Sequence, residues 1–170
     1  MVEMYRCSNC GYFHVGPAPE NCPVCGAPKS AFFPYEGPGD LTGTKTLENL
    51  KAAFAGESQA NRRYTLWKRV AELEGAPQSA ADAFDRAARE ETAHALGHLA
   101  YMGGVGTTAD NLAAAAAGET YECTDMYPSF AETAETEGLD DLAQFFRRVG
   151  SYEDEHRAAY LKALEELENS

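Results

Sequence analysis

Side chains that commonly bind metal ions occur twice in this chain with the same spacing. The set Glu57, Glu91 and His94 recurs 62 positions later as Glu119, Glu153 and His156. Residues three apart lie about one turn apart on the same face of a helix, so each Glu-x-x-His pair can hold one metal ion. The repeat therefore predicts two copies of one half-site, which together would bind a pair of metals.

The ligand types indicate which metals these would be. Carboxylate oxygens with one imidazole per metal suit iron or manganese, and helical bundles that bind two such ions use this inventory. Glu122 lies three residues after Glu119, whereas the equivalent position after Glu57 is Ala60, so the two metals would be chemically unequal. The alternative is that the acids form solvated helix faces. The histidines in register argue against it, and burying these carboxylates without cations would be prohibitive.

Four of the five cysteines form two tight pairs near the start of the chain, Cys7-x-x-Cys10-Gly and Cys22-x-x-Cys25-Gly. Two thiolates on each of two turns can close tetrahedrally around one metal, and tetrahedral sulfur suits both zinc and iron. A structural zinc ribbon is thus an open alternative to an iron site. In a reducing cytosol such pairs are read as metal ligands rather than as disulfides.

The elements that must position these residues are helices after a short segment of different composition. Residues 1 to about 35 are rich in Cys, Gly and Pro, and a linker over 34–43 leads into Ala-, Glu- and Leu-rich sequence. We expect helices over 46–74, 79–102, from 108 onward, and over 139–168, with Pro128 dividing the third near Tyr127. Four long helices with short connections predict a helix bundle.

The composition excludes several classes of function. The formal net charge of −13 argues against electrostatic binding to nucleic acid or to anionic lipid. No apolar run approaches the length of a membrane span, and no signal peptide follows Met1, so we expect a soluble cytoplasmic protein.

The two cysteine pairs resemble rubredoxin in its short form, and together with the helical motifs they resemble rubrerythrin. The most specific stretches are Gly56-Glu57-Ser58-Gln59-Ala60, Glu91-Thr92-Ala93-His94, Glu119-Thr120-Tyr121-Glu122, Tyr127-Pro128 and Glu153-Asp154-Glu155-His156. The N-terminal position of the cysteines is similar to the reverse rubrerythrins, whose domain order is swapped. The resemblance implies a mainly α protein, with a rubredoxin-like four-cysteine domain at 1–36 and a ferritin-like four-helix bundle at 45–170.

The resemblance also implies cofactors and residue roles. One iron would lie on Cys7, Cys10, Cys22 and Cys25, and a non-haem di-iron centre would lie in the bundle. Glu91 and Glu153 would bridge the irons, Glu57 would bind one of them, and Glu119 with His156 would bind the other. His94 and Glu122 would alternate as ligands on oxidation. Tyr64 and Tyr127 match the family's tyrosines that hydrogen-bond these glutamates.

The implied activity is reduction of hydrogen peroxide to water, in protection against oxidative stress. Electrons from NAD(P)H would arrive through a separate reductase and the four-cysteine iron. The alternatives are a dioxygen reductase, a ferroxidase or iron-handling protein of the ferritin kind, and a non-catalytic scaffold with a zinc ribbon. The attached four-cysteine pattern counts against iron storage, which needs no electron carrier.

The short connection between the second and third helices bears on the oligomeric state. In a ferritin-like bundle these helices run parallel, so the chain must climb about 28 Å between them. The five residues 103–107 span at most roughly 17 Å. Either the two helices are antiparallel within one chain, or the third and fourth helices cross into a partner. Because the resemblance implies parallel helices, we expect a domain-swapped homodimer, in which each di-iron site draws Glu57, Glu91 and His94 from one chain. Unwinding of residues 108–118 would permit a single-chain site, but the run Ala113 to Ala117 favours helix.

Overall fold

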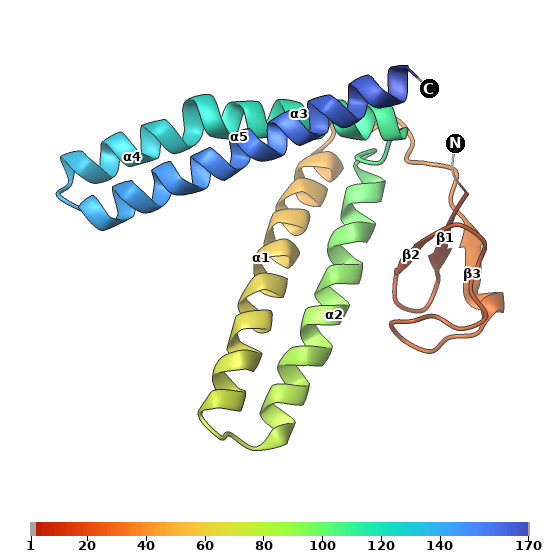
Figure 1. The fold of residues 1–170 in the computed structure, drawn as a ribbon. Coiled ribbons are helices and arrows are strands. Elements are labelled where there is room, and N and C mark those ends of the chain that lie inside the picture. Colours follow the sequence, from red (N-terminus) through yellow and green to blue (C-terminus); the bar gives the residue numbers. More distant parts are fainter. Residues whose placement is uncertain (1–2, 170) are drawn as a thin grey trace. The chain divides into compact units, whose positions relative to one another are not determined.

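The computed structural model describes residues 3–169. The predicted start of the first domain at residue 1 and the predicted end of the second at residue 170 therefore lie outside the described residues. The chain forms two compact units, Met1–Val105 and Gly106–Ser170, and each is described by itself. Figure 1 shows the first unit as a small sheet with two long helices and the second as a separate helical hairpin. Within the described range, no helix is long and apolar enough to cross a membrane.

The cysteine-bearing segment forms a three-stranded antiparallel sheet in the order β2-β1-β3. Its strands are β1 (Met4–Cys7), β2 (Phe13–Val15) and β3 (Phe32–Pro34), with a short 3₁₀ turn, η1 (Lys29–Ala31), before the last strand. Gly11 and Gly26 each follow the second cysteine of a pair and have positive φ angles of 77° and 74°. Each donates its N–H to the carbonyl of the first cysteine. Glycine is required there because other residues rarely adopt this left-handed conformation.

The first pair of long helices is α1 (Lys45–Leu73) and α2 (Gln78–Tyr101), which lie side by side as an antiparallel hairpin (Figure 1). Thr44 caps α1 by accepting a hydrogen bond from the Leu47 N–H, and Gly75 with a positive φ ends the helix region. The buried residues of both helices are mostly alanine. The buried Asn61 bridges the helices by donating to the Ala88 carbonyl at 2.6 Å.

The second unit contains α3 (Thr108–Tyr121), a π-helical segment η2 (Glu122–Met126), α4 (Tyr127–Thr136) and α5 (Asp140–Glu168). A reciprocal capping box between Thr107 and Asp110 begins α3. The last helix α5 packs along α3, η2 and α4. All four predicted helical regions are thus present, with ends within one residue of those expected from the sequence.

Near Tyr127, where Pro128 was predicted to divide the third helix, the helix changes form without ending: the π-helical segment runs to Met126 and α4 begins at Tyr127. Glu57 and Glu119 are 62 positions apart, but Tyr64 and Tyr127 are 63 apart, so the second copy contains one extra residue. A π-helical turn accommodates one inserted residue without ending the helix. Pro128 follows at the start of α4, where its missing N–H breaks one hydrogen bond of a continuous helix.

An aromatic cluster recurs in both hairpins. Its members are Tyr64, Trp67 and Phe84 in the first unit, and Tyr127, Phe130 and Phe146 in the second. The rings of Tyr64 and Phe84 are 6.2 Å apart and tilted by 32°. Those of Tyr127 and Phe146 are 6.3 Å apart and tilted by 35°. The repeat therefore includes the packing around the predicted ligands as well as the ligands themselves.

Candidate metal centres

The four paired cysteines converge at one end of the small sheet. One ligand atom from each of Cys7, Cys10, Cys22 and Cys25 lies within 4.8 Å of all the others. The Cys7 and Cys25 sulfurs are 3.8 Å apart, the Cys10 and Cys22 sulfurs are 3.6 Å apart, and all four are free thiols. A tetrahedral site with metal–sulfur bonds of about 2.3 Å has sulfur–sulfur edges of about 3.8 Å. The spacing therefore fits one tetrahedral metal and excludes disulfides between these cysteines in this structure.

Backbone amides approach the cysteine sulfurs, as expected at turns that end in glycine. The pKa of the exposed Cys25 thiol is lowered to about 6, chiefly by a hydrogen bond from the Asn9 side chain and then by one from the Ala27 N–H. Burial raises the pKa of Cys22, while the N–H groups of Cys25 and Val24 act in the opposite direction. Hydrogen bonds to sulfur stabilise a thiolate, which is the form that binds iron or zinc.

The first half-site lies on the hairpin of α1 and α2. Ligand atoms of Glu57 from α1, and of Glu91 and His94 from α2, all lie within 4.8 Å of one another. His94 Nδ1 is 2.8 Å from Glu91 Oε2. The pKa of Glu57 is raised, first by its hydrogen bond with Glu91 and then by burial. Two carboxyl groups this close repel each other when both are ionised, and a cation bound between them would remove that repulsion.

The second half-site repeats this geometry on α3 and α5. Glu119, Glu153 and His156 also lie within 4.8 Å of one another, and His156 Nδ1 is 2.8 Å from Glu153 Oε2. His156 Nδ1 is 3.9 Å from Glu119 Oε1. Burial raises the pKa of Glu119, and the negative charges of Glu153 and Glu122 raise it further. Each unit thus presents one imidazole and two carboxylates, which is the donor set that the sequence predicted for each metal.

The π-helical segment places Glu122 beside the second half-site. Glu122 is its first residue, and its charge acts on both Glu119 and Tyr127. The pKa of Tyr127 is raised by burial and then by the charges of Glu122, Glu153 and Glu119. Tyr127 therefore lies near these carboxylates, and its hydrogen bond to a glutamate stays a prediction.

The counterpart tyrosine is placed differently. Tyr64 is half-buried on α1, and its ring contacts Trp67 and Phe84 within the first aromatic cluster. Its hydrogen bond to a glutamate of the first half-site stays a prediction. The sequence reasoning missed the extra residue of the π-helical segment, although the offset between the two tyrosines would have revealed it.

The family model described as Rubrerythrin matches residues 48–164, and the model described as Rubrerythrin, rubredoxin-like domain matches residues 5–33. The chain belongs to the rubrerythrin family. Rubrerythrin of Porphyromonas gingivalis is 43% identical over 142 residues, which cover 76% of this chain and 70% of that protein.

Two further relatives extend this result. Rubrerythrin of Nitratidesulfovibrio vulgaris is 37% identical over 134 residues, covering 71% of this chain and 70% of the relative. Reverse rubrerythrin-1 of Clostridium acetobutylicum is 34% identical over 117 residues, which cover 61% of this chain and 64% of that protein. The rubredoxin-like segment precedes the helical segment here, in the order that the sequence predicted.

Membership in the rubrerythrin family confirms the predicted fold class, a ferritin-like helical domain preceded by a small four-cysteine domain. It also supports, in general terms, an oxidoreductase with a di-iron peroxidase role in oxidative stress. The cofactors of this family, one iron on four cysteines and one non-haem di-iron centre, fit the three donor clusters described above.

Proposed function

We propose that this rubrerythrin-family protein reduces hydrogen peroxide to water with electrons relayed through its four-cysteine site. The observation that carries the proposal is the presence of three preformed donor clusters, each with its ligand atoms within 4.8 Å. In this proposal residues 1–36 form the electron-receiving domain and residues 45–170 form the domain that holds the di-iron centre. An NAD(P)H-dependent reductase would supply the electrons in the cytoplasm.

The proposed ligands divide into two chemical groups. The cysteines Cys7, Cys10, Cys22 and Cys25 would hold one iron, and Glu57, Glu91, His94, Glu119, Glu122, Glu153 and His156 would hold two. When bound, the di-iron centre supplies both electrons for breaking the O–O bond of peroxide, and the four-cysteine iron returns them singly. Glu91 and Glu153 are proposed to bridge the two metals, and His94 and Glu122 to alternate as ligands.

The side chains of the second half-site can manage the protons of this reaction. Crowding by Glu122 and Glu153 helps raise the pKa of Glu119, so this group of carboxyls holds a proton more readily than isolated ones. A carboxyl displaced from a metal could then protonate an oxygen atom of the substrate. The pKa of Tyr127 is raised, so its phenol stays protonated, and we propose that it donates a hydrogen bond to these carboxylates and orients them. We propose the same role for Tyr64 in the first half-site.

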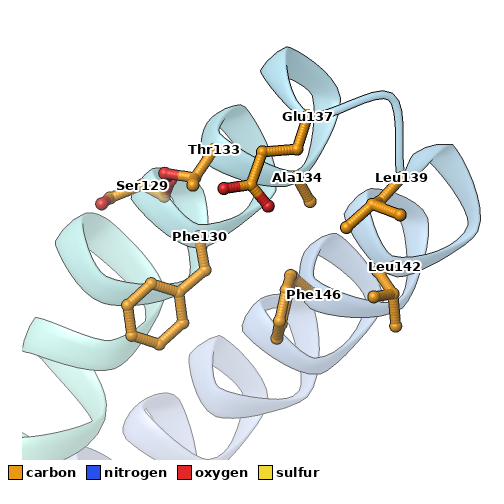
Figure 2. A pocket seen from close by; sticks show the side chains of 8 residues that line it. All are labelled: Ser129, Phe130, Thr133, Ala134, Glu137, Leu139, Leu142 and Phe146. Atoms are coloured by element: carbon orange, nitrogen blue, oxygen red, sulfur yellow. The ribbon is translucent and has the colours of Figure 1, made fainter.

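The two half-sites lie in different compact units, and we propose that a second copy of the chain completes each centre in a domain-swapped homodimer. The connection between α2 and α3 comprises only residues 102–107. Each hairpin also leaves large apolar side chains exposed, including Leu66, Trp67 and Leu73 in the first unit and Phe145, Tyr152 and Leu161 in the second. An apolar groove of about 580 Å³ between α4 and α5, lined by Phe130, Leu142 and Phe146, is part of this uncovered surface (Figure 2).

Exposed apolar surface of this kind is usually covered by a partner. Light scattering of the iron-loaded protein should give the mass of two chains. A monomer that holds the full complement of iron would overturn the domain-swapped arrangement and leave the peroxidase proposal standing.

The proposed activity is tested by reducing the iron-loaded protein without oxygen and adding one equivalent of peroxide. The visible absorption of the oxidised four-cysteine iron should return as peroxide is consumed, because that iron refills the di-iron centre. Cys25→Ser, which alters the exposed cysteine ligand, should remove the band and slow turnover with the reductase. If peroxide disappears while the wild-type band does not return, the relay is wrong.

A further inference from the structure

The four-cysteine domain contacts α2 of its own chain through a glycine. Gly97 is buried on α2, and a methyl group added there would lie 3.5 Å from both the Gly11 carbonyl oxygen and the Phe13 ring. Gly11 directly follows Cys10, so the contact is made by the cysteine turn itself. The neighbouring Ala93 and Ala100 of α2 are 2% and 4% exposed, which marks a close-packed helix surface.

An aromatic cluster holds the same contact one turn further along α2. Phe13, Tyr35 and Tyr101 pack edge to face, with ring centroids 4.8, 5.2 and 5.4 Å apart. The Tyr35 hydroxyl donates to the Ala100 carbonyl at 3.0 Å, and the Arg6 guanidinium donates to the Tyr101 hydroxyl. Edge-to-face pairs stabilise by about 0.5–1.5 kcal/mol beyond the area they bury. These contacts therefore hold the small domain in one orientation on the helix.

The position of this surface on α2 relates it to the first half-site. Gly97 follows His94 by three residues and Tyr101 follows it by seven, so all three lie on one side of the helix within two turns. The cysteine turn thus lies about one helical turn from a predicted metal ligand. The contact lies within the first compact unit and requires no second chain.

We infer that α2 is a docking surface for the cysteine turn. Gly97 is then a positioning residue that sets the distance between the cysteine turn and His94 of the same chain. This inference rests on the proposed function, and it gives the route by which electrons enter the di-iron centre. The ferrous ion on the four cysteines would be oxidised and a ferric ion at Glu57, Glu91 and His94 would be reduced. One electron would move at a time, with no bond made or broken.

The test uses side chains of graded size at Gly97. Gly97→Ala should keep the docked arrangement, because its methyl group meets its neighbours at ordinary contact distance. Gly97→Leu should push the cysteine turn away. Gly56→Leu is the matched control, since nothing lies within 4 Å of a Cβ added at Gly56.

Docking is measured first without any redox chemistry, in the full chain with zinc on the four cysteines. In the wild type, Gly97→Ala and Gly56→Leu, ¹⁵N relaxation should show the amides of Gly11 and Phe13 tumbling with α2. In Gly97→Leu they should tumble independently, while far-ultraviolet circular dichroism stays unchanged. Arg6→Ala combined with Tyr101→Phe should loosen the same amides, and it keeps the test decisive if Gly97→Leu does not fold.

The electron route is measured next in the iron-loaded protein. Gly97→Leu should slow the return of the four-cysteine absorption after peroxide by about tenfold or more, since displacement of reacting groups by an ångström is costly. The first oxidation of the reduced di-iron centre should be unchanged. Independent tumbling of the two amides in the wild type would overturn the docking. If the wild type is docked and the undocked variant Gly97→Leu still recovers its four-cysteine absorption at the wild-type rate, the proposed electron route is wrong. The peroxidase proposal would then still stand.

Discussion

Gly150 on α5 offers a quantitative test of the packing around the second half-site. An ideal Cβ at this position would lie 3.1 Å from the Cβ of Tyr127, which is tighter than an ordinary contact. The atom it meets is anchored to the backbone, so a rotamer change cannot relieve the overlap. The equivalent residue in the first hairpin, 62 positions earlier, is Ala88. Glycine is thus needed at position 150 only in the second copy of the repeat, which is also the copy with the extra residue in its π-helical segment.

The expected effect of Gly150→Ala follows from two opposing contributions. Replacing a helical glycine by alanine stabilises by about 1 kcal/mol, because alanine loses less backbone entropy on folding. Overpacking a fitted contact costs about 1–3 kcal/mol. We therefore expect Gly150→Ala to lower the free energy of unfolding by about 0–2 kcal/mol. Gly56→Ala and Gly118→Ala are the controls, because nothing lies within 4 Å of either added methyl group, and both should stabilise.

The measurement is urea unfolding of the three iron-loaded variants and the wild type under identical conditions. Gly150→Ala should also change the near-ultraviolet circular dichroism, because Tyr127 must move and its ring packs against Phe130 and Phe146. If Gly150→Ala stabilises as much as the two controls, the close approach of α5 to Tyr127 is wrong. The link between the extra residue of the π-helical segment and the need for glycine at position 150 would then lose its support.

Two further substitutions test separate parts of the structure. Asn61→Leu should destabilise by about 1–3 kcal/mol in urea unfolding, because it removes the donor to the Ala88 carbonyl and the Thr92 hydroxyl inside the first hairpin; a neutral result would contradict the bridging role. Glu122→Ala should leave the protein folded with the four-cysteine absorption intact while slowing peroxide consumption by at least about a hundredfold. Wild-type rates in this variant would remove Glu122 from the reaction.

Much of the helical structure could be predicted because its signals are local. The ends of α1 agree with the sequence prediction within one residue, since the Thr44 side chain caps its start and the positive φ of Gly75 stops the helix just past its end. The ends of α2 agree equally well. The two carboxylate and histidine clusters were also anticipated, because ligands three residues apart on a helix share a face, and the four-cysteine cluster was anticipated from its two Cys-x-x-Cys turns. Their roles as ligands stay predictions of the sequence and the family.

The remaining features depend on contacts that are distant in the sequence. The small sheet was not predicted, since its strands have three or four residues and no clear alternation. Nothing in the sequence of α2 distinguishes Gly97 from any other helical glycine, because its importance comes from Gly11 and Phe13 on a separate domain. The π-helical segment changes the register by a single residue, which a search for an exact repeat overlooks.

The most direct test of the central claim is the iron content and Mössbauer spectrum of protein grown with ample iron. The three donor clusters predict about three irons per chain, one in a tetrahedral sulfur environment and two in a coupled oxygen and nitrogen environment. Zinc on the cysteines, or a chain that binds only the sulfur-ligated iron, would contradict the proposed peroxidase.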